Sequence, residues 1–238
     1  MLTAISGYWM ISKSKTLDSN YFKWFKNSLS IDCPYVFFYY DDSIYNMVKE
    51  IRDKLVSPTH YIRMNIDQFY TYKFYDNIQT DWVHCPSKEL NIIWIQKLFL
   101  MQIVKNLNPF NSDYFIWIDA GICEYRDKTP PATIFPNRDK LLSLPTDKFV
   151  FTSSEFDFFI PNRPNDDYYH YIAGTSFLLH KNFIDFFVEL FKTYLNEYLS
   201  KTDWRYTDQV IYTIIYKEHP ELFHKIGHGF GKIVELLY

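Results

Sequence analysis

The sequence is short of the features that mark secreted, membrane and zinc-binding proteins. Its three cysteines, Cys33, Cys85 and Cys123, are odd in number and lack metal-type spacing, which favours three buried thiols in a reducing compartment over a disulfide framework or a zinc site. No apolar segment reaches the roughly 18 residues that a membrane span needs. The N-terminus also lacks a basic stretch followed by an apolar one. We therefore expect a cytoplasmic protein without a transmembrane segment.

An excess of charge of one sign is also missing. The net charge is −3, and the 25 basic residues are scattered along the chain rather than gathered in one stripe, so nucleic acid is not an expected partner. No long Pro/Gly/Ser linker, internal repeat or low-complexity block divides the 238 residues. We expect one domain over residues 1–238, long enough for a sizeable core.

A regular alternation of strand-like and helix-like segments is present instead. Apolar or aromatic runs predict strands at residues 3–11, 35–40, 59–64, 114–119, 149–152 and 171–180. Amphipathic segments predict helices at residues 19–29, 43–55, 86–107, 182–199 and 207–218. The segments predicted as loops are residues 67–82, 126–147 and 155–170. Strands that alternate with helices predict a parallel sheet.

The run from Tyr114 to Gly121, Tyr-Phe-Ile-Trp-Ile-Asp-Ala-Gly, is the most informative segment. An unbroken apolar run predicts a strand buried on both faces, and open α/β sheets bind ligands at the carboxyl ends of such strands. Asp119 lies at that end, where it is either a simple turn residue or a ligand for a divalent cation. Ala120 leaves room beside it, and Gly121 lets backbone approach a ligand closely.

Lys97 lies off the polar face of the helix predicted at residues 86–107. Two interpretations are open. The side chain can snorkel to solvent while its aliphatic stem covers the helix. Alternatively, its ammonium can reach over the sheet toward a phosphate or a substrate carboxylate.

Three further segments carry groups suited to a ligand site. Gly174 interrupts a strand-like run, which indicates either a close approach by a ligand or backbone, or a bulge. Thr207 and Asp208 are typical of an N-cap and first helical turn, and an acid there can also orient a sugar hydroxyl or act as a base. The tail from His228 to Lys232 places an imidazole and an ammonium on a glycine-rich segment, either as ligand groups or as a loose turn.

Together these segments resemble glycosyltransferases of the GT-A fold, and most closely the HtrL/YibB-like group of bacterial proteins. The matching segments are Trp-Ile-Asp-Ala-Gly at 117–121, Trp94 and Lys97 on the preceding helix, Ala-Gly-Thr at 173–175 and Thr-Asp-Gln at 207–209. The resemblance covers most of the chain. It implies an α/β fold of the GT-A type, with a mostly parallel central sheet flanked by helices on both faces.

The resemblance also implies a divalent metal, Mn²⁺ or Mg²⁺, on the diphosphate of a nucleotide-sugar. In GT-A enzymes an Asp-x-Asp motif at the strand end binds this metal, and Asp119 corresponds to its first acid. Gly121 stands at the second acid position, so the metal site is expected either to be completed from elsewhere or to be weaker than usual. Glycogenin-like families end in a similar His-x-x-Gly-x-Lys stretch, which implies His228 as a metal ligand and Lys232 as a group that stabilises the departing nucleoside diphosphate.

The same resemblance implies a nucleotide-sugar site. The first strand and its loop, Ser6 to Ser12, are implied to face the nucleotide, with Tyr8 as the stacking partner of the base. Asp208 is the implied acid that assists the acceptor hydroxyl, with Glu155 and Asp157 as alternatives. The residues implied to bind the nucleotide-sugar are Ser6, Gly7, Tyr8, Lys97, Asp119, Ala120, Gly121, Gly174, Thr175 and Lys232.

The sequence thus predicts a metal-dependent glycosyltransferase that moves a sugar from a nucleotide-sugar, in the first instance a UDP-sugar, to a glycan, a glycolipid or another hydroxyl acceptor. The glycine at the second acid position leaves open a catalytically silent domain that binds sugar or nucleotide. A Rossmann-type methyltransferase or dehydrogenase is disfavoured, because no Gly-x-Gly-x-x-Gly follows the first strand.

Overall fold

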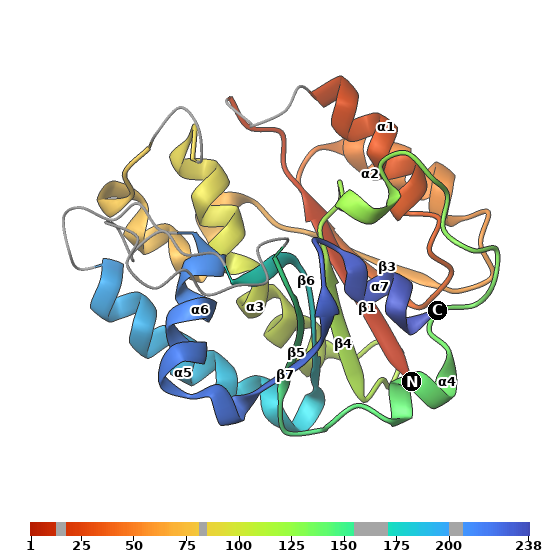
Figure 1. Cartoon of the computed structure of the whole chain (residues 1–238). Coiled ribbons are helices and arrows are strands. Elements are labelled where there is room, and N and C mark those ends of the chain that lie inside the picture. The colour runs from red at the N-terminus through yellow and green to blue at the C-terminus, as the bar shows by residue number, and fades with distance from the viewer. Residues whose placement is uncertain (13–17, 81–84, 155–170, 200–206) are drawn as a thin grey trace.

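The computed structural model describes residues 1–12, 18–80, 85–154, 171–199 and 207–238 (Figure 1). The strands are β1 (Leu2–Tyr8), β2 (Tyr35–Tyr39), β3 (Thr59–Arg63), β4 (Tyr114–Ile118), β5 (Phe149–Ser153), β6 (Ile172–His180) and β7 (Phe223–His228). The α-helices are α1 (Asp18–Ser28), α2 (Asp42–Arg52), α3 (Lys88–Leu107), α4 (Arg138–Leu142), α5 (Lys181–Leu199), α6 (Asp208–Glu218) and α7 (Lys232–Leu237). Short 3₁₀ helices are η1 (Ile66–Gln68), η2 (Tyr70–Asn77), η3 (Cys123–Tyr125) and η5 (Pro220–Leu222). None of the helices in these ranges is long and apolar enough to cross a membrane.

Within the described ranges, seven strands form one sheet in the order β3-β2-β1-β4-β6-β5-β7. β1 pairs in parallel with β2 and β4, and β2 pairs in parallel with β3. β6 runs antiparallel to β4 and β5, whereas β7 is parallel to β5. The predicted mostly parallel sheet is therefore confirmed. The carboxyl ends of β1, β4, β5 and β7 meet at one edge, which is where open α/β sheets bind ligands.

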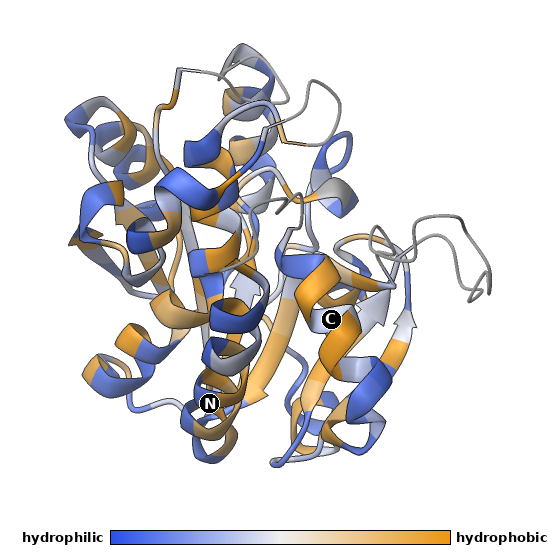
Figure 2. Ribbon diagram, turned by 90° about the vertical axis from the view of Figure 1, so that its left-hand side faces the viewer, coloured by the Kyte–Doolittle hydropathy of each residue, from blue (hydrophilic) through white to orange (hydrophobic). Residues whose placement is uncertain are grey.

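Hydrophobic side chains cover both faces of this sheet. Along β4, Tyr114, Ile116 and Ile118 join a core with α1, α2 and α7, whereas Phe115 and Trp117 join a core with α3, α5 and α6. Successive strand residues alternate between the faces, so a strand covered on both faces must be apolar throughout. Figure 2 shows hydrophobic colour along the strands and mixed colour on the surrounding helices. The predicted helices on both faces are thus confirmed.

The C-terminal region differs most from the predicted secondary structure. Residues 223–228 form the edge strand β7, although no strand was predicted there. Phe223 is buried, but His224 and Lys225 are both exposed, so the segment lacks the alternation of a half-buried strand. The chain then turns at residues 229–231 and forms α7, for which no helix was predicted, and the loop predicted at residues 126–147 contains α4.

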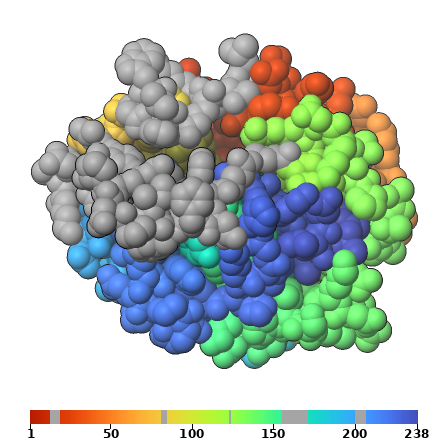
Figure 3. All heavy atoms as spheres, viewed as in Figure 1, coloured from red at the N-terminus to blue at the C-terminus, as the bar shows by residue number. Residues whose placement is uncertain are grey.

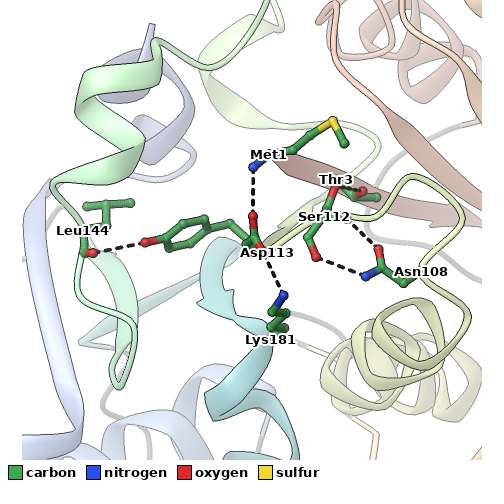
Figure 4. A network of polar contacts seen from close by, with 8 residues as sticks. Met1, Thr3, Asn108, Ser112, Asp113, Leu144 and Lys181 are labelled. Carbon is green, nitrogen blue, oxygen red and sulfur yellow. Dashed lines mark hydrogen bonds and ion pairs between the residues drawn. The ribbon is translucent and has the colours of Figure 1, made fainter.

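Polar groups tie together the opposite edge of the sheet, where β1 and β4 begin (Figure 4). Asp113, directly before β4, lies 3.2 Å from the amino group of Met1 and 2.8 Å from Lys181 Nζ. Thr3 Oγ1 donates a hydrogen bond of 2.8 Å to Ser112 Oγ. These contacts join the starts of β1, β4 and α5 at the edge remote from the expected ligand site.

Candidate active site

The long helix α3 carries the first residue of the site. Ser87 precedes the helix, and its hydroxyl accepts a hydrogen bond from the Leu90 N–H, which makes Ser87 the N-cap. The helix ends at Asn108, whose backbone is left-handed with φ of 40°, a conformation that asparagine tolerates as a C-cap. Between these caps, α3 packs against β1 and β4. Lys97 therefore lies next to the carboxyl edge of the sheet.

Lys97 is the centre of a buried ionic cluster. Its side chain is 3% exposed, so the interpretation that it snorkels to solvent is wrong. The ammonium donates to the Gly174 carbonyl over 2.8 Å and lies 3.0 Å from Asp119 Oδ1 and 3.1 Å from Asp208 Oδ2. The three N–H donors of the ammonium thus face three oxygens of the protein itself.

The charge of Lys97 is preserved by its two acidic partners. Burial by itself lowers the pKa of Lys97, because it disfavours the charged form. The negative charges of Asp119 and Asp208 act in the opposite direction, and the net result is a raised pKa. The ammonium therefore remains protonated at neutral pH.

Asp119 directly follows β4 and has a side chain that is 28% exposed. Its backbone N–H donates to the Thr175 carbonyl over 2.8 Å, which joins the ends of β4 and β6. Trp117 Nε1 donates to Asp119 Oδ1 over 2.7 Å, and the same oxygen faces Lys97. The other oxygen, Oδ2, accepts no hydrogen bond from any residue in the described ranges. One carboxylate oxygen is therefore fixed, and the second is left for a ligand.

Asp208 opens α6 and has a side chain that is 2% exposed. Thr207 occupies the predicted N-cap position, although its hydroxyl makes no capping hydrogen bond. Asp208 Oδ2 lies 3.1 Å from Lys97 Nζ, but within the described residues no group meets this oxygen with hydrogen-bond geometry. Burial raises the pKa of Asp208 to about 6; Lys97 opposes this rise, and the charge of Asp119 adds to it.

Gly174 lets the start of α6 approach β6 closely. A Cβ at this position would lie 2.6 Å from Gln209 Cγ and 2.7 Å from Asp208 Oδ2, which is too close for either atom. The Gly174 N–H donates to Gln209 Oε1 over 3.1 Å. The segments 173–175 and 207–209, singled out in the sequence, are thus in direct contact, and the close approach at Gly174 is made by side chains of α6.

A pocket opens beside this cluster at the carboxyl edge of β1 and β4. It holds about 670 Å³ of empty space, part of it open solvent. Asp119 is the only carboxylate among its described lining residues, and Lys97 and Arg126 are the only cations among them. The lining residues are Gly7, Tyr8, Trp9, Ile11, Tyr21, Leu90, Ile93, Trp94, Lys97, Trp117, Asp119, Ala120, Gly121, Arg126 and Thr175.

Most residues predicted to bind a nucleotide-sugar line this pocket. They are Gly7, Tyr8, Lys97, Asp119, Ala120, Gly121 and Thr175. Ser6 is completely buried in β1, and neither Ser6 nor Gly174 is part of the lining. Asp208, predicted to act as the acid or base, contacts Lys97 and does not line the pocket. The alternatives Glu155 and Asp157 lie outside the described residues.

Neither of the two predicted tail residues is part of this lining. His228 ends the edge strand β7 with an exposed side chain. Lys232 Nζ lies 3.1 Å from Glu124 and also contacts Glu235. In Figure 3 the dark blue C-terminal segment lies beside green residues from the region after β4. The predicted roles of His228 as a metal ligand and of Lys232 as a leaving-group cation therefore stay predictions.

The sequence interpretation missed part of the pocket wall. Tyr21 comes from α1, and Arg126 follows η3 in a segment predicted as loop. Helical periodicity does not distinguish Tyr21 from the many core aromatics of this chain. Arg126 could have been found from its position, because loops that follow strands at the carboxyl edge surround the ligand site.

The described residues do not fit the predicted divalent metal. No three His, Cys, Asp or Glu side chains in the described ranges lie close enough together to hold an ion. A Cβ on Gly121 would lie 3.0 Å from the Tyr21 ring and 3.1 Å from the Trp24 ring, so a second carboxylate has little room there. Mn²⁺ and Mg²⁺ prefer several oxygen ligands. Asp119 alone offers one carboxylate, and its Oδ1 already faces Lys97.

A solved structure has the same fold. Apo mouse xyloside xylosyltransferase 1 superimposes with a TM-score of 0.56 and 15% sequence identity, over 94% of this chain and 84% of that chain. The mixed, mostly parallel seven-stranded sheet with helices on both faces is therefore a GT-A glycosyltransferase fold. At this identity the likeness concerns the fold and not the substrate.

The sequence itself also matches a family. Among curated proteins, none matches the chain. The model of the HtrL_YibB family, described as a bacterial protein of unknown function, matches residues 79–236, which is more than half of the chain. The matched region contains β4, the strand that ends at Asp119, together with α3 and α6. The protein therefore belongs to the HtrL/YibB family.

Proposed function

We propose that this protein is a glycosyltransferase that moves a sugar from a nucleotide-sugar, with UDP-sugars as the first donors to test, to a hydroxyl of a glycan or glycolipid. The observation that carries the proposal is the position of Asp119. Asp119 directly follows β4 in a GT-A fold, and its carboxylate lines a pocket at the carboxyl edge of the sheet. The cluster with Lys97 and Asp208 holds that carboxylate in place from behind.

The lining of the pocket suits both halves of such a donor. Tyr8, Tyr21 and Trp94 offer aromatic surfaces for a base or a sugar ring. Asp119 and Thr175 offer oxygens for sugar hydroxyls. We assign Asp208 a positioning role, because its buried carboxylate contacts Lys97 rather than the pocket.

The proposed reaction exchanges one bond at the anomeric carbon for another. The bond between that carbon and the β-phosphate oxygen breaks, and its electron pair stays on the oxygen. The acceptor oxygen forms the new bond to the same carbon. The products are the glycoside, the nucleoside diphosphate and a proton, for which Asp119 is the only carboxylate in the described pocket wall.

A metal requirement is a separate prediction that comes from the sequence, from the position of Asp119 and from the resemblance. Because the described residues do not fit a divalent cation, we assign no step to a metal. Assays in Mn²⁺, in Mg²⁺ and in EDTA test the requirement directly. Activity that EDTA removes and Mn²⁺ restores would support it, and His228→Ala would then be the first ligand variant to titrate with the metal.

A catalytically silent sugar- or nucleotide-binding domain is the second candidate. The observation that favours it is the crowding of Gly121 by Tyr21 and Trp24, because the usual second acid of the GT-A site has little room there. The two candidates differ in turnover. Binding of a nucleotide-sugar without hydrolysis or transfer, for every donor tested, would favour the silent domain.

The test compares the two aspartates that flank β4. Release of nucleoside diphosphate from UDP-, GDP- and ADP-sugars, and of CMP from CMP-sugars, is measured with and without simple glycoside acceptors. Asp119→Asn should lower turnover about 100-fold or more, because it removes the charge of the only acid among the described lining residues of the pocket. Asp113→Asn, the same change at the other end of β4, should leave turnover unchanged. Full activity of Asp119→Asn would disprove the proposed site.

A further inference from the structure

Arg126 is a cation of the pocket wall that no part of the predicted site used. It follows η3, in the segment after β4, and is half-buried. Its Nε donates to the Gly121 carbonyl over 3.2 Å. Its guanidinium carbon lies 4.0 Å from the centre of the Trp24 ring, at cation–π distance. The side chain is thus held on one side by the strand-end motif and on the other by α1.

The terminal nitrogens of Arg126 remain available for a ligand. Within the described part of the chain, Nη1 and Nη2 have no hydrogen-bond acceptor and no carboxylate partner. Lys97, the other cation in the described lining, already faces Gly174, Asp119 and Asp208. An anion that enters the pocket therefore finds its free N–H donors on Arg126.

The geometry of a guanidinium selects phosphate groups among such anions. Its planar N–H groups match two oxygens of one phosphate, or one oxygen of each of two neighbouring phosphates. The Asp119 carboxylate repels an anion, and Lys97, which is shared between Asp119 and Asp208, offsets only part of this repulsion. Arg126 is the other positive charge among the described lining residues. A nucleoside diphosphate offers the charge and the oxygens that Arg126 can bind.

Gly121 links the missing acid to the placement of Arg126. The Cβ of a side chain at this position would lie 3.0 Å from the Tyr21 ring and 3.1 Å from the Trp24 ring, so both rings would have to shift by a few tenths of an ångström. Trp24 is also the ring on which Arg126 stacks. Glycine at this position therefore leaves the Trp24 ring in place beneath Arg126, and it offers no carboxylate to a metal. At this place in the pocket wall, a side chain, Arg126, therefore carries the positive charge.

We propose that Arg126 binds the diphosphate of the donor and stabilises the nucleoside diphosphate as it leaves, in the position where a divalent cation is usual for this fold. This inference rests on the proposed function. As the bond between the anomeric carbon and the β-phosphate oxygen breaks, the electron pair remains on that oxygen, and the guanidinium balances the added negative charge. The acceptor oxygen forms the new bond to the anomeric carbon, and the proton of the acceptor hydroxyl is released.

The experiment measures binding of UDP, GDP, CDP and ADP, and of the matching nucleosides, by calorimetry in EDTA and in Mn²⁺. Wild-type protein should bind one nucleoside diphosphate in EDTA. Arg126→Gln should weaken that binding about tenfold or more, because it removes charge-assisted hydrogen bonds, and should leave binding of the nucleoside unchanged. Arg126→Lys keeps the positive charge but loses the paired N–H donors of the guanidinium. Its affinity for the nucleoside diphosphate should lie between those of the wild type and Arg126→Gln. Thermal unfolding of each variant confirms that the protein is folded.

Arg138→Gln is the matched control, because it removes the same charge from an exposed position on α4 that is not part of the pocket lining. Its affinity for the diphosphate should equal that of the wild type. Equal affinities of wild type and Arg126→Gln for the diphosphate would overturn the role of Arg126 but not the proposed function. Binding of the diphosphate by wild-type protein that disappears in EDTA would have the same meaning. No binding of any nucleoside diphosphate by wild-type protein, in EDTA or in Mn²⁺, would overturn the proposed function together with this inference.

Discussion

The strand β4 has an aspartate before it and an aspartate after it, and the two differ in their exposure to water. Asp113 pairs with the Met1 amino group and Lys181, and all three groups are between 42% and 50% exposed. Asp119 pairs with Lys97, which is 3% exposed and also contacts Asp208, itself 2% exposed. The same pairing of ammonium and carboxylate therefore lies in water at one edge of the sheet and inside the protein at the other.

The difference shows which of the two clusters is structural and which is a candidate for function. Water solvates each partner of an exposed pair when the other is removed, so such pairs contribute little. Partners of a buried pair depend on one another, and burying them is costly even when they are paired. A buried ionic cluster beside a pocket is thus poorly explained by stability alone, and perturbed pKa values are common at functional sites. The carboxyl-edge cluster has this character.

The largest expected effect comes from removing the buried ammonium. Lys97→Met should lower the free energy of unfolding by about 3–5 kcal/mol, because Asp208 then stays buried without its cation. Urea denaturation at pH 7 measures the change. The double variant Lys97→Met/Asp208→Asn should recover part of the loss, since it removes the stranded charge. A loss below about 1 kcal/mol for Lys97→Met would place this pair in the same class as the exposed one.

Local sequence patterns were enough to predict most of the fold. The alternation of apolar runs with amphipathic segments predicted six of the seven described strands, and the unbroken run into Asp119 predicted a strand covered on both faces. The exception, β7, lies at the sheet edge, where His224 and Lys225 are exposed in succession. Its single neighbour, β5, supplies the pairing, and no property of the segment itself indicates it.

In the candidate site, the sequence predicted the residue at the strand end but not the contacts made by residues on helices and loops. Asp119 was found because the carboxyl end of a buried strand has a fixed place in the sheet. The partners of Lys97 were not found, because helical periodicity identifies the face of a residue but not what lies opposite. Arg126 was missed because a loop has no periodicity, and its orientation depends on Trp24 in α1, far away in the sequence.

A second, smaller effect contrasts the pH dependence of the two edges. Burial raises the pKa of Asp208 to about 6, so between about pH 4 and 6 the folded state binds more protons than the unfolded state at this residue. The stability contributed by this protonation is present at pH 4 and is lost as the pH rises to about 6. Relative to Asp208→Asn, the wild type should therefore lose up to about 3 kcal/mol of unfolding free energy between pH 4 and pH 7.

Asp113 should show the opposite sign. Its hydrogen bond to Lys181 and the nearby N-terminal amino group lower its pKa, so its contribution is present above the ordinary aspartate pKa and is lost as the pH falls through the lowered value. Urea titrations of wild type, Asp208→Asn and Asp113→Asn from pH 3 to pH 7 measure both effects. Wild-type and Asp208→Asn curves that run parallel over this range would show that the buried carboxyl is not protonated near pH 6.

The smallest expected effect comes from the same substitution at the exposed edge. Lys181→Met removes an ammonium 2.8 Å from Asp113, but water and the Met1 amino group still solvate that carboxylate. The loss of unfolding free energy should be about 1 kcal/mol or less, and it should shrink further in 1 M NaCl, because salt screens exposed charges. The loss for Lys97→Met should change little with salt, since Lys97 and its partner Asp208 are both shielded from the solvent. A salt-insensitive loss for Lys181→Met, as large as that for Lys97→Met, would mean that exposure is not what separates the two ends of β4.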